Sequence, residues 1–304
     1  MDNNVIVLSE RIFMIIHSPV LLKEVLSFVP EGAKIIVDGT LGHGGHAISF
    51  LQKVPKACVI GLDVDSFMLQ KAEGRMNNEQ GIMKERFVGL HESYANINTV
   101  VGNKKADFIL LDLGVNLEHF LATERGFSLK GNAPLDMRFD QGMTRTAADV
   151  VNTYTPSDLQ SLFVRYADFT SDKAQELANT IVSERRKHLI STTFDLKKVL
   201  GLCGLGNSAV AVIFQAIRIE VNGELNNLDT FLKKFSLVLN SGGRCAILSY
   251  HSIEDRLVKQ AFQALADTGN YTLLTKKVIA PHYTEVAKNK AARSAKMRVL
   301  EKNE

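Results

Sequence analysis

The stretch VDGTLGHGGHAISFL, residues 37–51, places four glycines and two histidines between an apolar run and an expected helix. Residues 42–47 satisfy the pattern G-x-G-x-x-G/A, which is typical of loops that bind dinucleotides. Because the loop follows a β-rich run, we expect it at the carboxyl end of a strand, where parallel sheets bind their ligands. The pattern alone leaves a phosphate site, a metal site and another kind of cofactor site open.

The surrounding sequence predicts an α/β fold. Apolar runs at 33–40, 57–65, 85–91 and 106–114 predict buried strands, and helical stretches separate them. This βαβ series predicts a parallel, right-handed, doubly wound sheet. Strands are expected again at 242–252, 270–279 and 295–302, whereas residues 115 to about 207 carry mainly helical signals, with helix starts expected near Thr155 and Thr193. We therefore predict an N-terminal extension (1–16), a sheet domain (17–114 with 208–304) and an inserted helical domain (115–207).

Composition excludes few functions. The 304 residues are 45% hydrophobic and 23% charged with a net charge of +3, which is ordinary for a globular protein. Residues 276–304 alone sum to +5, which suits either an anionic partner or a solvated basic tail. The three cysteines form no CxxC pair, no signal peptide is expected and no apolar run reaches eighteen residues, so we predict a cytoplasmic protein without a membrane partner.

Acidic residues after the expected strands narrow the choice of cofactor. Asp63 lies twenty-one positions after Gly42, a spacing that suits a contact with the ribose of an adenosine-containing cofactor. Asp38 directly precedes the loop, where a carboxylate would repel a diphosphate but suit the cationic amino end of a methionine group. A local role for Asp38, bonding the amides of its own turn, is the alternative. With Asp112 after the fourth strand, the layout favours S-adenosylmethionine over NAD.

A metal site is the weaker interpretation of the loop. His43 and His46 are spaced to share one face of a turn, but no HExxH motif or nearby carboxylate pair completes a ligand set. The motif GxxxxGK[ST] is absent from the sequence, which excludes P-loop chemistry. We therefore expect no metal.

Longer motifs make the prediction specific. They are HSPVLLKEVL, VDGTLGHGGHA, GLDVD, LLDLGV, ERGFSL, PLDMRFD, FQAIRIEVNGEL, GGRCAILSYHSIEDRLVK and ARSAKMRVLEK, in this order from His17 onward. On these motifs the sequence resembles the bacterial 16S rRNA (cytosine-N4)-methyltransferase family, ribosomal small-subunit methyltransferase H. The resemblance implies a Rossmann-like class I S-adenosylmethionine-dependent methyltransferase sheet with an inserted helical domain. It also implies that the target is a cytidine of 16S rRNA near the decoding centre, within the small ribosomal subunit.

The resemblance implies a set of site residues. Those for the cofactor are Gly44, Gly45, His46 and Ala47 in the loop, Asp63 at the ribose, Tyr94 near the adenine, Asp112, and His119 in place of the family's usual glutamine. Candidate contacts to the RNA are Arg138, Arg218, Asn222, His251, Arg293, Lys296 and Arg298. For Arg218, a buried pair with Glu220 or another carboxylate is the alternative. Ser252 is the expected cap of the helix that follows it, and Lys296 and Arg298 are expected on the solvated face of a strand. The family's Ser-Ser-Pro after DLGV is Asn116-Leu117-Glu118 here, and a stretch containing His-Pro is replaced by NSAVAVI at 207–213.

Methyl transfer to cytosine N4, the reaction that the resemblance implies, needs hydrogen-bond acceptors and no metal. The lone pair of cytosine N4 is delocalised into the ring, so acceptors facing its two hydrogens would favour the nucleophilic form. Backbone carbonyls after Asp112 and the side chain of Asn116 are the candidates, and Asp112 and Asn116 are the predicted catalytic residues. A base inside folded RNA must also be turned out of its stack to reach such a site.

Two other functions remain as alternatives. An NAD-linked oxidoreductase would fit the glycine pattern but not Asp38. A catalytically weakened homologue that binds RNA or assists ribosome assembly would fit the departures at 116–118 and 207–213. The sequence leaves both a monomer and a homodimer open.

Overall fold

A computed structural model of the chain describes residues 19–78, 85–116, 118–119 and 124–304. Its contacts divide the chain into two compact units, one formed by the residues up to Gly114 together with Asn226–Glu304, the other by Val115–Leu225. The predicted N-terminal extension, 1–16, lies outside the described residues. Each unit is described by itself below.

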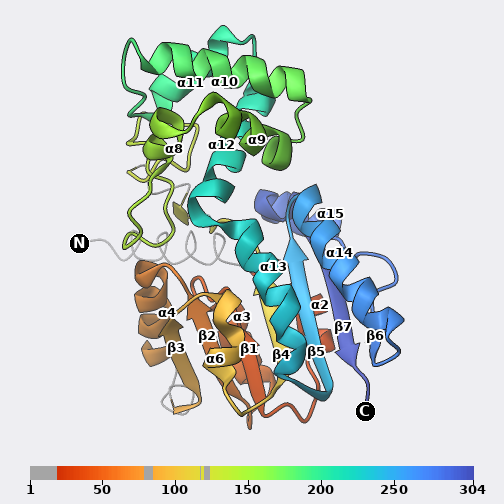
Figure 1. Cartoon of the computed structure of the whole chain (residues 1–304). Coiled ribbons are helices and arrows are strands. Elements are labelled where there is room, and N and C mark those ends of the chain that lie inside the picture. Colours follow the sequence, from red (N-terminus) through yellow and green to blue (C-terminus); the bar gives the residue numbers. More distant parts are fainter. Residues whose placement is uncertain (1–18, 79–84, 117, 120–123) are drawn as a thin grey trace, which may run out of the picture. The chain divides into compact units, whose positions relative to one another are not determined.

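The first unit is built on one sheet (Figure 1). Its strands are β1 (Ile35–Asp38), β2 (Cys58–Asp63), β3 (Phe87–His91), β4 (Ala106–Asp112), β5 (Leu239–Ser249), β6 (Tyr271–Leu273) and β7 (Lys296–Lys302). They follow the order β3-β2-β1-β4-β5-β7-β6. The strands β1 to β5 pair in parallel, and β7 runs antiparallel to both β5 and β6. The order reverses between β1 and β4, and such a switch point is where open α/β sheets bind ligands.

Alternating residues of β4 supply cores on both faces of the sheet. Phe108 and Leu110 belong to one buried cluster, and Ile109 and Leu111 to the other. All four are fully buried, which explains why the strand is a continuous apolar run in the sequence. The alternation thus gives each face its own layer of helices.

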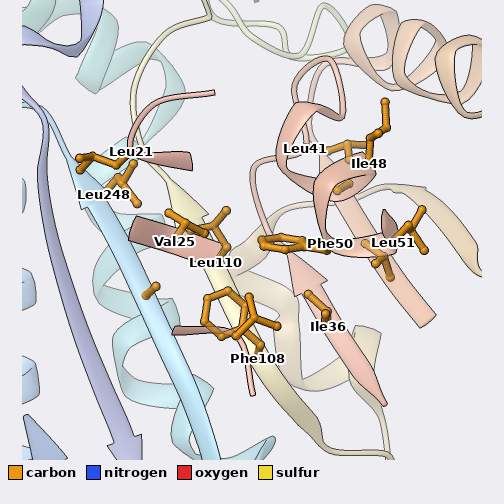
Figure 2. Packing of buried hydrophobic residues seen from close by; sticks show 14 of the residues in the cluster. Leu21, Val25, Ile36, Leu41, Ile48, Phe50, Leu51, Phe108, Leu110 and Leu248 are labelled. Carbon is orange, nitrogen blue, oxygen red and sulfur yellow. The ribbon is translucent and has the colours of Figure 1, made fainter. Parts of the chain in front are cut away.

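Three helices pack on the first face of the sheet. They are α2 (Leu22–Phe28), α3 (Gly45–Lys53) and α4 (Ser66–Asn78). Figure 2 shows Phe50 of α3 beside Phe108 of β4, with their ring centroids 5.6 Å apart in an edge-to-face arrangement. Leu21 and Val25 pack near Leu248 in the same cluster. This core fixes the position of α3, which starts directly after the glycine loop.

The second face is covered by other helices (Figure 1). They are α6 (Ile97–Val101), α13 (Glu224–Lys234) and α14 (Ser252–Asp267), with the 3-10 turns η1 (Tyr94–Asn96) and η2 (Phe235–Leu237) beside them. Helix α15 (Tyr283–Lys288) and the 3-10 turn η3 (Lys290–Ser294) precede β7. No helix in the described ranges is long and apolar enough to cross a membrane.

The second unit is helical in its described part. Its main helices are α8 (Ala147–Thr153), α9 (Pro156–Ala167), α10 (Ser171–Arg185), α11 (Thr193–Leu202) and α12 (Asn207–Asn222). Thr146, Thr155 and Thr192 each cap a helix through a capping box with an aspartate three residues later. Such caps satisfy amides that a helix start leaves without partners, and the sequence predicted helix starts near Thr155 and Thr193.

The boundary between the units differs from the sequence prediction at one end. Both place the start of the inserted part at residue 115, but by contacts the second unit extends to Leu225 instead of 207. Helix α12 contacts α8 and α9, so it groups with the helical unit. Its motif FQAIRIEVN contains alternating polar and apolar residues and therefore gave no clear signal of where the insertion ends.

Candidate active site

The glycine loop between β1 and α3 is held by backbone hydrogen bonds to two strands. The Gly39 amide donates to the Leu110 carbonyl of β4 at 2.8 Å, and the Leu41 amide donates to the Leu62 carbonyl of β2 at 2.8 Å. A Cβ built on Gly39 would lie 2.4 Å from Cδ2 of Leu111, so a larger residue would not fit there. The loop therefore lies directly on the carboxyl ends of β2 and β4.

Positive φ angles explain two further glycines of the loop. Gly42 has φ 51° and Gly44 has φ 74°, in the left-handed region that side chains disfavour. Gly44 is the N-cap of α3, and Gly45, His46 and Ala47 form its first turn. As in any helix, the amides of this turn have no acceptor within the helix, and they suit a carboxylate.

Asp38, at the end of β1, is the most buried of the three predicted aspartates. It is 1% exposed, and its Oδ1 accepts a hydrogen bond from the Thr40 amide at 3.3 Å. Its Oδ2 has no hydrogen-bond partner in the described part of the chain. Burial raises the pKa of Asp38 to about 7, and the nearby carboxylates of Asp112 and Asp63 act in the same direction. The turn contact that the sequence analysis kept as an alternative is present, but it leaves one oxygen without a donor.

Asp63, at the end of β2, joins the glycine loop to the turn between β2 and α4. Its Oδ2 accepts from the Gly42 amide at 2.8 Å, and its Oδ1 accepts from the Asp65 amide at 2.8 Å. Each carboxylate oxygen has two lone pairs, so these bonds leave acceptor capacity on a partly exposed side chain.

Asp112, at the end of β4, is the third carboxylate of this edge. Its amide donates to Oγ1 of Thr40 at 2.6 Å, and its Oδ1 accepts from the Tyr250 hydroxyl at 2.6 Å. Burial raises the pKa of Asp112 to about 7, although the Tyr250 hydrogen bond acts against this. The sequence prediction that Asp38, Asp63 and Asp112 follow neighbouring strands is confirmed by the sheet order.

His46 faces this edge from the first turn of α3. Its Nε2 lies 3.2 Å from the Val20 carbonyl, which only accepts, so Nε2 carries the proton and Nδ1 carries a lone pair. Nδ1 lies 3.8 Å from Oδ2 of Asp112. Burial lowers the pKa of His46 to about 4, so the ring is neutral near pH 7. Among the described residues, no group of three His, Cys, Asp or Glu side chains is placed to hold a metal.

Tyr94 lies in η1, after β3. Its ring meets that of Phe231 edge to face, with centroids 5.9 Å apart. Its Cβ is 3.2 Å from a Cβ built on Gly39, so the two residues are close to one another. Tyr94 thus lies beside the start of the glycine loop, within the same unit as the aspartates.

Two predicted residues, Asn116 and His119, belong to the second unit. Oδ1 of Asn116 accepts from the Glu118 amide at 3.1 Å, and its carbonyl accepts from the His119 amide at 2.9 Å. The His119 ring is buried with Phe127 and Phe139, at centroid distances of 5.1 and 5.2 Å. Asn116 therefore stabilises a local turn, and His119 is part of an aromatic cluster.

The predicted RNA contacts Arg138 and Arg218 have strong internal partners. Arg138 binds Asp136 through two hydrogen bonds, Nε to Oδ1 at 2.7 Å and a terminal nitrogen to Oδ2 at 2.8 Å. Arg218 binds Glu224 in the same way, at 2.8 and 2.9 Å. The sequence analysis left both arginines open as phosphate contacts. The structure assigns their guanidinium groups to pairs within the second unit.

Asn222 has an equally local set of partners. Its Nδ2 donates to the carbonyls of Met137 and Arg218, and its Oδ1 accepts from the Phe139 amide. Met137 has φ 61°, which a side chain tolerates only where surrounding contacts fix the backbone. Asn222 thus fixes the PLDMRFD segment to α12.

The predicted contacts near the C-terminus differ in their surroundings. His251 is the N-cap of α14 in a capping box with Glu254, so the expectation that Ser252 caps this helix is wrong. Lys296 and Arg298 both pair with Asp255 of α14, at 3.4 and 2.7 Å. The expected solvated basic face of β7 is therefore ion-paired. Arg293, by contrast, is exposed in η3.

Comparison with known proteins identifies the family. The model of the MraW methylase family matches residues 14–303. The chain is 38% identical to "Ribosomal RNA small subunit methyltransferase H" of Brachyspira hyodysenteriae, over 99% of this chain and 100% of that protein. It is 39% identical to the protein of the same name from Elusimicrobium minutum, over 94% and 98% of the two chains.

The chain belongs to the MraW methylase family. It is a methyltransferase, and the prediction of an S-adenosylmethionine-dependent class I fold is confirmed. Among solved structures, an rRNA methylase from Streptococcus thermophilus aligns with 92% of this chain at 13% identity and a TM-score of 0.41.

Two features of the site were not assigned from the sequence. One is the Thr40 hydroxyl, which accepts from the Asp112 amide, and the other is the Tyr250 hydroxyl, which binds the Asp112 carboxylate. The signal for both was their position, since each follows a strand that ends at the same edge as Asp112.

Proposed function

We propose that the protein transfers a methyl group from S-adenosylmethionine to the exocyclic N4 of a cytidine in 16S rRNA, near the decoding centre of the small ribosomal subunit. The observation that carries this proposal is the 38% identity, over the whole length, with a relative named for methylation of small-subunit ribosomal RNA. Its partner is the small subunit and its location is the cytoplasm.

The residues of the first unit fit the cofactor. The buried Oδ2 of Asp38 needs a donor, and an ammonium group supplies both hydrogen and positive charge. The glycine loop brings backbone close to the same edge, where the amides of Gly45, His46 and Ala47 suit the methionine carboxylate. When bound, S-adenosylmethionine supplies an activated methyl group on a positively charged sulfur.

The remaining cofactor contacts proposed for the first unit come from residues at or after the carboxyl ends of its strands. Asp63 retains acceptor capacity for the ribose hydroxyls, and Tyr94, beside the start of the loop, would contact the adenine. Gly44 allows the turn that starts α3. His46, neutral and held by Val20, forms a wall of the site, and Asp112 adds a second carboxylate facing the cationic end.

The chain's own contribution to methyl transfer is alignment and electrostatics. Asp38 and Asp112, each with a pKa near 7, provide negative charge for a cationic cofactor once deprotonated. The carbonyls that follow Asp112 within the first unit would accept the hydrogens of the cytosine amine. Holding the amine in line with the methyl group is worth several orders of magnitude in rate.

The RNA contacts are proposed with unequal support. Arg293 is exposed, so its guanidinium is accessible to a phosphate. Arg138, Arg218, Asn222 and His251 act by shaping the surface, since their polar groups are used within the fold. Lys296 and Arg298 pair with Asp255, and we propose that their remaining N–H donors contact RNA.

The test is methylation by the purified protein of small subunits and of naked 16S rRNA, with the product nucleoside identified. We expect N4-methylcytidine, and no product with the Asp112→Asn variant. Another methylated nucleoside would refute the proposed target. Cofactor binding with no methylation of either RNA would favour the alternative of a catalytically weakened homologue that assists ribosome assembly. That alternative is suggested by residues 116–118, which differ from the family's Ser-Ser-Pro.

A further inference from the structure

Tyr250 connects two neighbouring strands at the catalytic edge of the sheet. It is the first residue after β5, and Asp112 is the last residue of β4, the strand that pairs with β5. The Tyr250 hydroxyl donates a 2.6 Å hydrogen bond to Oδ1 of Asp112. Both residues lie in the first unit, so this contact is internal to one compact body.

The ring of Tyr250 also contacts the segment that follows Asp112. Gly114 has φ 112°, and a Cβ built on it would lie 3.1 Å from Cδ2 of the Tyr250 ring. The ring therefore packs against the backbone of Gly114, while the hydroxyl reaches Asp112. One side chain thus fixes both ends of the sequence Asp112-Leu113-Gly114.

Asp112 has no second side-chain donor in the described part of the structure. Nδ1 of His46 lies 3.8 Å from Oδ2, beyond hydrogen-bond distance, and it carries a lone pair because Nε2 donates to Val20. The Asp112 amide donates to the Thr40 hydroxyl, and this hydrogen bond involves the backbone of Asp112 and not its carboxylate. Tyr250 is therefore the group that orients this carboxylate.

We propose that Tyr250 is a positioning residue of the methyl-donor site. Its hydroxyl fixes the Asp112 carboxylate with Oδ1 occupied and favours the charged form, so that Oδ2 is available to the cationic cofactor. Its ring holds the backbone whose carbonyls face the amine. The inference rests on the proposed cofactor site and does not depend on which nucleoside is methylated.

The groups around Asp112 determine how its charge responds to pH. They are Asp38 from β1, which is itself close to Asp63, His46 from α3 and Glu254 from α14. Glu254 also accepts from the Tyr250 amide at 2.8 Å. Burial and Glu254 raise the pKa of Asp112 to about 7, and the Tyr250 hydroxyl lowers it. Removal of that hydroxyl therefore raises the pKa further and protonates Asp112 at higher pH.

Calorimetry of S-adenosylhomocysteine binding between pH 6 and 9 tests the proposal without any RNA. In the wild type we expect the affinity to fall as the pH decreases through about 7. In Tyr250→Phe this fall begins at higher pH. A rise of about one pKa unit reduces the charged fraction at pH 7 from about one half to about one tenth, a roughly fivefold loss of affinity. The matched control is Tyr271→Phe in β6, whose hydroxyl has no hydrogen-bond partner among the described residues, and which should keep the wild-type profile.

A double-variant cycle shows whether Tyr250 acts through Asp112. In the Asp112→Asn background, Tyr250→Phe should cause no further shift of the profile, because the titrating carboxylate is gone. The proposal would be overturned if the pH profile of Tyr250→Phe matched that of the wild type. It would also be overturned if the double variant lost as much affinity as the two single variants together. If Tyr250→Phe does not fold, 3,5-difluorotyrosine at position 250 keeps the ring and strengthens the donor. The profile must then shift to lower pH, and an unchanged profile is again contrary to the proposal.

The two proposals fail in different ways. Loss of the Tyr250 effect with intact N4-methylcytidine formation would leave the proposed function in place. A different methylated nucleoside with the expected binding profiles would leave the role of Tyr250 in place.

Discussion

The amide of Gly42 donates a 2.8 Å hydrogen bond to Oδ2 of Asp63, which ties the glycine loop after β1 to the end of β2. Asp63→Ala removes the acceptor of this amide and of the Asp65 amide. We expect the free energy of unfolding to fall by about 1–3 kcal/mol. Because the loop contact and the proposed ribose contact are lost together, the Kd for S-adenosylmethionine, measured by calorimetry, should rise at least about tenfold.

Asp107→Ala is the matched control for that variant. Asp107 accepts from the amides of Lys34 and Ile35 at 2.7 and 3.0 Å, at the start of β1. This is the opposite edge of the sheet, so stability should fall while cofactor affinity stays unchanged. Equal affinities of the two variants would exclude a special role for Asp63.

Asp38 makes the stability of the cofactor-free protein depend on pH. Its pKa is about 7 in the fold and about 3.8 when unfolded, so between these values the folded state holds a proton that the unfolded chain has released. Stability therefore falls as the pH rises from about 4 to 7, and then levels off. The contribution is of the order of 2–4 kcal/mol.

Urea unfolding at several pH values measures this effect. In Asp38→Asn the slope between pH 4 and 7 should be reduced, and the variant should be more stable than the wild type at pH 7.5 but bind the cofactor more weakly. Identical slopes in the two proteins would show that Asp38 is not the titrating group.

Gly39→Ala tests the close approach of the loop to β4. The new Cβ would meet Cδ2 of Leu111 at 2.4 Å and Cβ of Tyr94 at 3.2 Å. Overpacking of this kind costs about 1–3 kcal/mol. We expect a lower melting temperature and weaker cofactor binding, whereas Gly32→Ala, where the added Cβ meets no atom within 4 Å, should change neither. A fully stable Gly39→Ala protein would contradict the packing described for the loop.

Mutations should distinguish the arginines that stabilise the fold from Arg293, which is proposed to contact RNA. Arg218 and Glu224 are 12% and 11% exposed, and Arg218→Ala removes the guanidinium that pairs with this largely buried carboxylate. We expect a loss of about 3–5 kcal/mol in unfolding experiments, part of which the apolar pair Arg218→Met with Glu224→Leu recovers.

Arg293→Ala should behave in the opposite way. The residue is exposed, so stability should be unchanged, while the affinity for 16S rRNA falls and the slope of log K against log salt decreases by about one. Filter binding over a range of salt concentrations measures both quantities. An unchanged slope would remove Arg293 from the RNA surface.

The sheet and its acidic edge were predictable because their signals are local. Buried parallel strands are continuous apolar runs, and the residue after each run lies at the carboxyl edge, which placed Asp38, Asp63 and Asp112 together. Threonine caps likewise revealed helix starts near Thr155 and Thr193.

The partners of charged side chains were not predictable, because they depend on tertiary contacts. Arg218 precedes both Glu220 and Glu224 in the sequence, and only the structure shows that Glu224 is the partner. The pairing of Lys296 and Arg298 with Asp255 joins residues about forty positions apart. The contact of Tyr250 with Asp112 spans 138 positions.

The central claim is that this chain methylates N4 of a cytidine in 16S rRNA, and mass spectrometry of nucleosides from small-subunit rRNA tests it most directly. The comparison needs wild-type cells, cells lacking the protein, and cells complemented with the wild type or with Asp112→Asn. We predict that N4-methylcytidine is lost with the protein, returns with the wild type and does not return with Asp112→Asn. An unchanged level of N4-methylcytidine in cells lacking the protein would contradict the claim.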